Sequence, residues 1–436
     1  MNFPVLSLTL ILPLIGILLI LLLPERREKE IKFISLLITF GVSLLTLLCL
    51  ANFDYQNPNM QFVERYPWIK SAGIDCHLGI DGISLPLFSL AAFLSLLVVI
   101  FSWEIKYRLK AYFGLLLLLE IGMLGIFVAL DFILFYIFWE WVLVPMYFLI
   151  TIWGGARRSY AGLKFLLYTL FGSVIMLIGI LGLYFASKLN TFNILEITKY
   201  KFPLNLQALF FVALFIGFAF KVPLFPFHTW LPDAYVEAPT GASVLLAGVL
   251  AKMGAYGFIR ISLPILPDAF RMFATPLAIL GVANIVYGAF VAMAQKDLKK
   301  LIAYSSLSHM GYIILGTATG TLSGLNGAVL GMFNHGTIIG VLFLLVGLIY
   351  QRTQTREIKD LEGLSLRVPF LSGILTFATL SAIGLPGLSA FVNEFLVLLG
   401  IFQSIWLKKI FIIFVIPGMI LTMIYFLRLL IRVNLF

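Results

Sequence analysis

The chain has 436 residues, of which 61% are hydrophobic and only 11% are charged. A soluble protein of this length could not bury so much apolar surface, so the composition excludes that class and predicts a membrane protein. The formal net charge of +10 does not indicate a nucleic-acid-binding protein, because the basic residues lie in short loops without interleaved aromatic residues. The two cysteines, Cys49 and Cys76, lie too far apart in the sequence to predict a metal site or a disulfide framework.

Apolar segments follow one another along nearly the whole chain. A hydrocarbon core of about 30 Å requires about 20 apolar residues per helix, whereas the alternating pattern of a membrane β-barrel is absent. We therefore predict an all-α, polytopic membrane protein with about 13 transmembrane helices. The predicted spans are residues 4–23, 32–51, 83–103, 111–130, 132–153, 162–187, 207–228, 241–262, 273–294, 300–318, 324–350, 370–400 and 408–432.

The loops between these spans differ in positive charge. Of the 30 Lys and Arg residues, 19 lie in the odd-numbered loops and the C-terminal end, and 9 lie in the even-numbered loops. Because cytoplasmic loops carry the excess of Lys and Arg, the odd-numbered loops are expected on the cytoplasmic (or matrix) side. The N-terminus is therefore expected outside.

Two of the predicted spans contain helix-breaking residues. Pro223 and Pro226 follow Lys221 in one span, and the sequence GLPG at 384–387 precedes Glu394 in the other. Proline removes a backbone donor, and freed backbone groups inside a membrane are tolerated only where they face protein or water. The two broken spans lie five spans apart, so they cross the membrane in opposite directions. This is the pattern of inverted repeats, although two unrelated kinked helices would give it as well.

The spacing of the breaks predicts the organisation of the chain. We expect a single membrane domain over residues 1–436. Within it we expect three N-terminal spans (1–110), a first five-helix unit (111–262) and a second, inverted five-helix unit (263–436), each unit holding one broken helix.

Charged side chains inside these spans are the candidates for function. Each costs about 2.5–3.5 kcal/mol at mid-helix on insertion scales, so a chain that keeps several is expected to use them as a proton or ion pathway. Lysine suits a relay, because burial lowers a lysine pKa towards neutrality and a nearby carboxylate raises it again. We predict that Lys221 pairs with Glu140 and that Lys252 receives the proton. The alternative for Lys221 is that its long side chain reaches the interface from a helix end.

Other ionisable residues are open to two interpretations. His309 and His335 are the mid-span histidines, and an unperturbed pKa of about 6.5 suits a proton shuttle, although a lone histidine can also be a packing residue. Polar residues near them could hold a water chain, namely Ser305, Ser306, Ser308, Asn334 and Thr337. Glu120 is either functional or a counter-ion for a lysine. The segment with His228, Asp233 and Glu237 is either a gate, an interface or a solvated loop.

Cofactor-binding motifs are absent from the sequence. It contains no dinucleotide fingerprint, P-loop, cysteine cluster or paired-histidine haem pattern. We therefore expect no cofactor and no redox active site in this chain.

Several stretches together resemble one family, the antiporter-like membrane subunits of proton-pumping NADH:quinone oxidoreductase (respiratory complex I), and within it the M type or chain 4 type. The resemblance occurs in family order over nearly the whole chain. It rests on LGIDGISLPL (78–87), the segments 130–155 and 164–173, FKVPLFPFHTWLPDAYVEAPT (220–240), LLAGVLAKMGAYGFIRI (245–261), KDLKKLIAYSSLSHMGY (296–312), MFNHG (332–336) with 342–358, and LPGLSAFVNEF (385–395).

The resemblance implies a proton channel along a buried polar axis. It implies Glu140 and Lys221 as a pair, Lys252 as the central lysine, His335 and His309 as connecting groups, and Glu394 as the terminal group. It also implies the L-type and N-type sister subunits, smaller membrane subunits and the lipid bilayer as partners, and a multi-pass location in the inner (plasma) membrane. Flavin, iron–sulfur clusters and quinone would belong to other subunits.

The sequence departs from the family pattern at a few points. That pattern has a fourteenth span, whereas this sequence ends after the thirteenth predicted one. Tyr235 stands where many relatives have histidine, and Asn393 stands where glycine is common. Subunits of multisubunit Na⁺/H⁺ antiporters and of membrane-bound hydrogenases share the same core and are the alternative. A scaffold subunit that transports nothing is the competing hypothesis of a different class.

Overall fold

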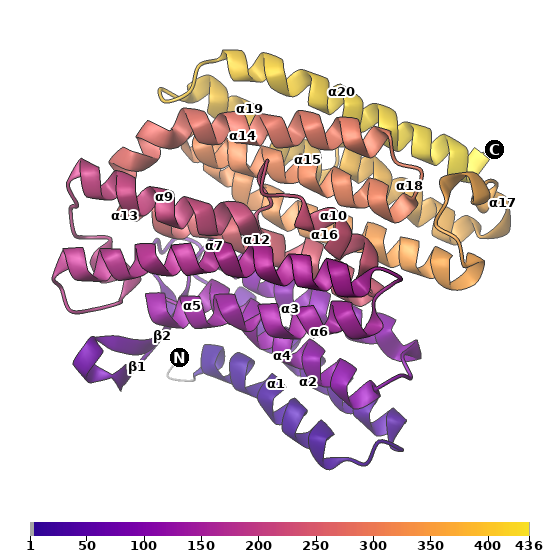
Figure 1. Cartoon of the computed structure of the whole chain (residues 1–436), viewed down its shortest axis with the longest axis horizontal. Helices are drawn as coiled ribbons and strands as arrows, with labels where there is room; N and C mark the ends of the chain where they lie inside the picture. Colours follow the sequence, from indigo (N-terminus) through magenta and orange to yellow (C-terminus); the bar gives the residue numbers. More distant parts are fainter. Residues whose placement is uncertain (1–3, 436) are drawn as a thin grey trace. The chain divides into compact units, whose positions relative to one another are not determined.

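The computed structural model describes residues 4–435, and its apolar segments are helical (Figure 1). Eleven helices in this part of the chain are long and apolar enough to cross a membrane. The two remaining predicted spans correspond to α15 (Leu298–Ala318) and to the shorter helices α18 (Pro369–Ile383) and α19 (Ser389–Gln403). The prediction of an all-α, polytopic membrane fold is therefore confirmed.

Packing divides the chain into two compact units. Unit 1 consists of Met1–Phe218 and Tyr256–Pro267, and unit 2 consists of Ala219–Ala255 and Asp268–Phe436. This division follows which helices pack together. The predicted division into two inverted five-helix units follows sequence order instead, and it stays a prediction.

Unit 1 contains the N-terminal helices and a β-hairpin. Within it α1 packs on α2 and α4, and α3 also packs on α2 and α4 (Figure 1). Its elements are α1 (Val5–Leu22), α2 (Glu28–Ala51), β1 (Gln61–Ile69), η1 (Lys70–Ala72), β2 (Ile74–Ile80), α3 (Ser84–Phe101), η2 (Ser102–Glu104), α4 (Leu109–Val128), α5 (Phe132–Trp141), α6 (Leu143–Trp153), α7 (Arg158–Ser187), α8 (Ile194–Ile197), most of α9 (Leu204–Lys221), η4 (Phe258–Ser262) and α13 (Leu263–Ile265).

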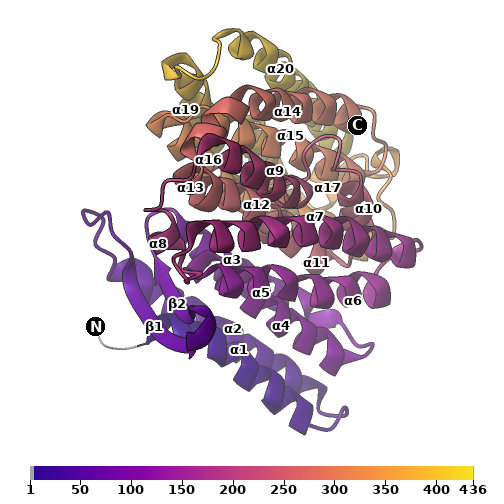
Figure 2. The same cartoon turned by 60° about the vertical axis from the view of Figure 1, so that its left-hand side comes forward.

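The hairpin lies in the long polar segment after α2, where we predicted no strand. β1 and β2 are antiparallel, with Tyr66 opposite Cys76. The Glu64 carboxylate on β1 accepts hydrogen bonds from Leu6 N–H at 2.8 Å and Ser7 N–H at 3.0 Å. These donors belong to the first turn of α1 and have no partner within the helix, so Glu64 caps α1 from a distant segment. Figure 2 shows the hairpin beside the start of α1.

Unit 2 is built around α16. This helix packs on α15, α18, α19 and α11. The other elements are α10 (Trp230–Glu237), α11 (Thr240–Leu245), η3 (Leu246–Leu250), most of α12 (Ala251–Gly257), α14 (Pro267–Met293), α16 (Leu322–Thr353), η5 (Ile358–Asp360), α17 (Leu364–Arg367), α20 (Ile410–Leu430) and η6 (Ile431–Leu435).

Both predicted helix breaks are present in unit 2. α9 ends at Lys221 and α10 begins at Trp230. In the segment between the two helices, Leu224 N–H donates back to Ala219 O in the last turn of α9, at 2.9 Å. Trp230 Nε1–H donates to Phe220 O at 2.9 Å, so protein groups satisfy part of the freed backbone. The second break begins at Gly384, whose φ of +78° ends α18 in the left-handed conformation that favours glycine.

A buried ion pair fixes the start of α3 within unit 1. The Arg260 guanidinium donates to the Asp81 carboxylate, and both side chains are at most 15% exposed. Burial alone would raise the pKa of Asp81, but Arg260 and the N–H groups of Ile83 and Ser84 outweigh burial, so the pKa lies below its usual value. The pair extends inward, because Arg260 Nε–H also donates to Tyr256 Oη at 3.1 Å.

We expect Asp81→Asn to destabilise the protein, because the substitution leaves the Arg260 charge buried without a counter-ion. Breaking a buried pair in this way costs about 3–5 kcal/mol. The measurement is the midpoint temperature of thermal unfolding of the purified protein in detergent. The double variant Asp81→Asn, Arg260→Gln should regain part of the loss. Equal stability of Asp81→Asn and the wild type would show that the pair contributes nothing.

Candidate functional site

Lys252 lies in the most deeply buried membrane-spanning segment, Thr240–Ile265. Its side chain is fully buried. Two π-helical segments flank it, η3 before and η4 after, and π turns shift the hydrogen-bond register of a helix and are frequent at functional sites. The Lys252 ammonium group reaches back along its own helix and donates to the carbonyl of Ala247 inside η3.

Lys252 also contacts a histidine on another helix. Its Nζ lies 2.5 Å from Nδ1 of His335, which projects from α16. If the lysine is protonated it donates to an unprotonated Nδ1, and if the histidine carries the proton the direction reverses. One proton can thus lie between the two side chains, which are 83 residues apart in sequence and belong to different helices.

The two histidines lie close to each other. The rings of His309 on α15 and His335 on α16 have centroids 6.0 Å apart at an angle of 61°. The Nε2 atom of His309 is buried and has no hydrogen-bond partner among the described protein residues. The separation is too large for a direct hydrogen bond between the rings, so a proton passing between them would need a water molecule.

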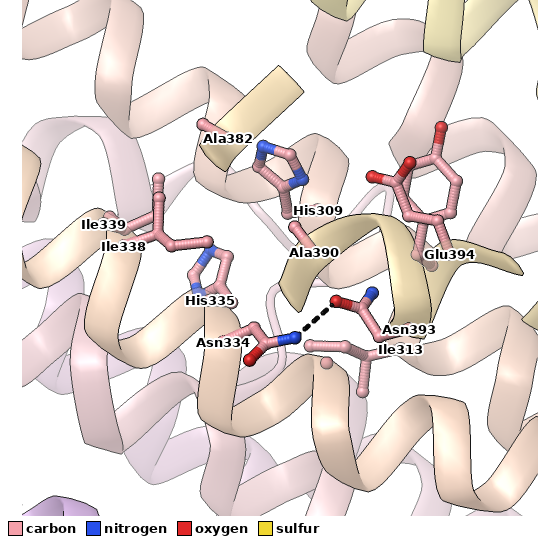
Figure 3. A pocket seen from close by; sticks show the side chains of 12 residues that line it. His309, Ile313, Asn334, His335, Ile338, Ile339, Ala382, Ala390, Asn393 and Glu394 are labelled. Carbon is pink, nitrogen blue, oxygen red and sulfur yellow. Dashed lines mark hydrogen bonds between the residues drawn. The ribbon is translucent and has the colours of Figure 1, made fainter. Parts of the chain in front are cut away.

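A small cavity joins the histidines to Glu394 (Figure 3). Its volume, about 20 Å³, is sufficient for an ordered water molecule. Polar groups from α15, α16 and α19 surround it. The lining residues are His309, Tyr312, Ile313, Gly331, Asn334, His335, Ile338, Ile339, Ala382, Ala390, Asn393 and Glu394.

An asparagine pair joins α16 to α19 beside the cavity. Asn334 Nδ2–H donates to Oδ1 of Asn393 at 2.9 Å and to the carbonyl of Ser389 at 2.8 Å (Figure 3). Both asparagines are buried. These bonds hold the second half of the broken span against the helix that carries His335.

Glu394 is buried, and its side chain lies beside Gly384 at the second break. A Cβ atom built on Gly384 would lie 2.8 Å from Oε2 of Glu394. The positive φ at position 384 favours glycine, and the missing Cβ leaves room for the end of the Glu394 side chain. The carboxylate lies on the cavity and does not face the surface of unit 2.

The remaining predicted residues lie elsewhere. Lys221 is buried at the end of α9, directly before the first break and outside the cavity lining. Glu140 lies near the end of α5 in unit 1 and is half-buried. Glu120 lies on α4 in unit 1 and is fully buried, and neither of its carboxylate oxygens has a hydrogen-bond partner among the described residues. The structure therefore brings together Lys252, His335, His309 and Glu394, all in unit 2.

Two residues of this region were not singled out from the sequence. Tyr312 lines the cavity, and its position three residues after His309 places both on one face of α15. Lys299 was counted as a loop charge but is buried, and it donates to the carbonyls of Val236 at 3.2 Å and Ala238 at 2.7 Å. Those carbonyls end α10, where a cation is favourable, so Lys299 holds the first broken region in place.

The segment with His228 and Glu237 forms the short helix α10 and the turn before it. Both side chains are buried. The interpretation of this segment as a solvated loop is therefore wrong, because Trp230, Leu231 and Tyr235 on the same helix are also buried in the protein interior. Within the described residues, no group of three or more His, Cys, Asp or Glu side chains could hold a metal ion.

A family profile described as "NADH:quinone oxidoreductase/Mrp antiporter, TM" matches residues 129–422. NADH-quinone oxidoreductase subunit M of Rickettsia bellii is 45% identical over 411 residues, covering 92% of this chain and 83% of that protein. NAD(P)H-quinone oxidoreductase chain 4 2 of Microcystis aeruginosa is 40% identical, covering 98% of this chain and 79% of that protein.

Solved structures give the same result. A chain of respiratory complex I from Thermus thermophilus superposes with a TM-score of 0.91 at 32% identity, covering 99% of this chain and 89% of that one. A chain of the Mrp complex from Dietzia shares the fold, with a TM-score of 0.85 at 23% identity. This chain belongs to the family of NADH-quinone oxidoreductase subunit M and chain 4, the antiporter-like membrane subunits of respiratory complex I.

Proposed function

We propose that the chain translocates protons across the membrane as part of an NADH:quinone oxidoreductase. The observation that carries this proposal is the row of buried ionisable groups in unit 2, from Lys252 through His335 and His309 to Glu394. Each link is either a direct contact or a shared cavity. A row of this kind in a membrane protein is the physical requirement for moving protons.

The proton path begins, in this proposal, at Lys221 and Glu140. Loss of the carboxylate's influence would favour release of the lysine proton, and Lys252 would receive it. Lys252 would pass a proton to His335 across their 2.5 Å contact. A water molecule in the cavity would carry it past His309 to Glu394, which is the exit group. Glu120 would act as a buried counter-charge within unit 1.

The driving reaction would take place in other subunits. We propose that this chain holds no cofactor and no redox site, and that quinone reduction elsewhere in the complex drives it. Its partners would be the L-type and N-type sister subunits and smaller membrane subunits. It would cross the inner (plasma) membrane with its N-terminus outside, as the distribution of Lys and Arg among the loops indicates.

The alternatives are a Na⁺/H⁺ antiporter or membrane-bound hydrogenase subunit. The family profile spans both oxidoreductase and Mrp proteins. The relatives at 40–45% identity, however, carry NADH-quinone or NAD(P)H-quinone oxidoreductase names, whereas the compared Mrp structure is 23% identical. The oxidoreductase assignment is therefore favoured.

Lys221→Ala should abolish most proton pumping in the assembled complex, because the substitution removes the group from which, in this proposal, the proton is released. Lys221→Arg should not restore pumping, since arginine does not lose its proton. Pumping is measured as NADH-driven acidification of inverted membrane vesicles, with NADH oxidation by an artificial acceptor as the control for electron entry. Normal pumping by an assembled alanine variant would favour the scaffold hypothesis.

Gly384→Ala should impair pumping through Glu394. The added methyl group would lie 2.8 Å from Oε2, so the end of the Glu394 side chain must shift, and the left-handed conformation at φ +78° adds strain at the break beside it. Gly373→Ala on the same helix, α18, is the matched control, because a Cβ there meets nothing within 4 Å. The same vesicle assay should show a clear loss for Gly384→Ala alone. Equal pumping by both variants would contradict the placement of Glu394 on the path.

A further inference from the structure

A second, larger cavity lies in unit 2 and shares no lining residue with the first. It has a volume of about 320 Å³ and lies where α14 ends, α15 begins and α20 ends. Both α14 and α20 are membrane-spanning helices, so their ends mark the boundary between hydrocarbon and headgroups. Its lining residues include Lys296, Leu301, Ile358, Arg428, Leu429 and Arg432.

The rim of this cavity is cationic. Lys296, Arg428 and Arg432 are exposed, and none of them forms an ion pair within the described residues. Arg428 and Arg432 are four residues apart and therefore lie on one face of α20 and its continuation, η6. The nearby carboxylate of Asp297 is already engaged, since it caps α15 through Lys300 N–H and pairs with Arg356 at 3.4 Å. Three cations thus converge without a protein anion.

The floor of the cavity is apolar and rigid. Leu301, Ile358, Leu429 and Tyr425 are buried at its base. Two hydrogen bonds join the loop that carries Lys296 to the start of η5 and the residues before it. Ile358 N–H donates to Lys296 O at 2.9 Å, and Leu298 N–H donates to Arg356 O at 2.8 Å. These two bonds hold the backbone of the rim in place.

Exposed apolar side chains lie on the two helices that lead to this cavity. Phe290 on α14, and Ile424 and Leu427 on α20, are between 38% and 52% exposed. Apolar side chains of this kind suit contact with acyl chains. A ligand that matches the whole site therefore has an anionic oxygen-rich head and an apolar body.

We propose that this cavity binds the phosphate-bearing headgroup of an anionic phospholipid, with the acyl chains along the exposed faces of α14 and α20. Basic pockets between membrane helices at the headgroup level recognise lipids by this combination of charge and shape. A free phosphate ion shares the chemistry of the head but gains nothing from the apolar faces. Carboxylates of a neighbouring subunit are the competing class of occupant.

The test uses the purified complex, reconstituted in nanodiscs and examined by native mass spectrometry for retained phospholipid. The wild type should retain phosphatidylglycerol in preference to phosphatidylcholine. The double variant Arg428→Gln, Arg432→Gln should bind phosphatidylglycerol about 30-fold more weakly, since each cation near a lipid surface contributes about fivefold. The matched control is Lys408→Gln, Lys409→Gln, which removes two exposed cations at the opposite end of α20.

Three outcomes would overturn the proposal. The first is equal retention of phosphatidylglycerol by both double variants and the wild type. The second is release of the bound lipid by millimolar inorganic phosphate, which would assign the site to a soluble anion. The third is efficient cross-linking of an Arg428→Cys variant to a neighbouring subunit, which would assign the cations to a protein interface. Retention lost only in the Arg428, Arg432 variant, and unaffected by phosphate, would support it.

Discussion

The contact between Lys252 and His335 is the interaction on which the rest of the account depends. A lysine in a membrane-spanning helix is costly unless polar groups of the protein surround it. Here the Ala247 carbonyl and a histidine nitrogen meet it, and both lie within unit 2. The same need for polar neighbours places Glu394 on a water-sized cavity and leaves Asn334 and Asn393 bonded beside it.

Irregular backbone is the means by which these groups are brought together. The π segment η3 precedes Lys252, and the break at Gly384 lets the backbone approach the Glu394 carboxylate. In this arrangement the Ala247 carbonyl in η3 accepts from the Lys252 ammonium group, and the glycine at 384 leaves room beside Glu394. Buried hydrogen bonds from Trp230 and Lys299 stabilise the first break in the same way. At this break, protein groups thus provide hydrogen-bond partners for backbone that is not α-helical, as a membrane interior requires.

The sequence predicted the helices well, because apolar length and proline or glycine breaks are local signals. Residues 222–229 and 384–388 are broken as expected. The β-hairpin was missed, and its contact with α1 through Glu64 joins segments that are distant in sequence. The π segments and the burial of Lys299 were missed because each depends on packing between elements. The roles of Lys252, His335, His309 and Glu394, like those of Glu140, Lys221 and Glu120, stay predictions.

The central claim is that Lys252 is kept in the interior to carry protons. Its direct test is the number of protons pumped per electron pair by an assembled complex with Lys252→Met. Methionine has a similar volume, so the substitution removes the ionisable group without opening a large cavity. The account predicts a lower proton-to-electron ratio with the complex intact. An unchanged ratio in a fully assembled complex would contradict it.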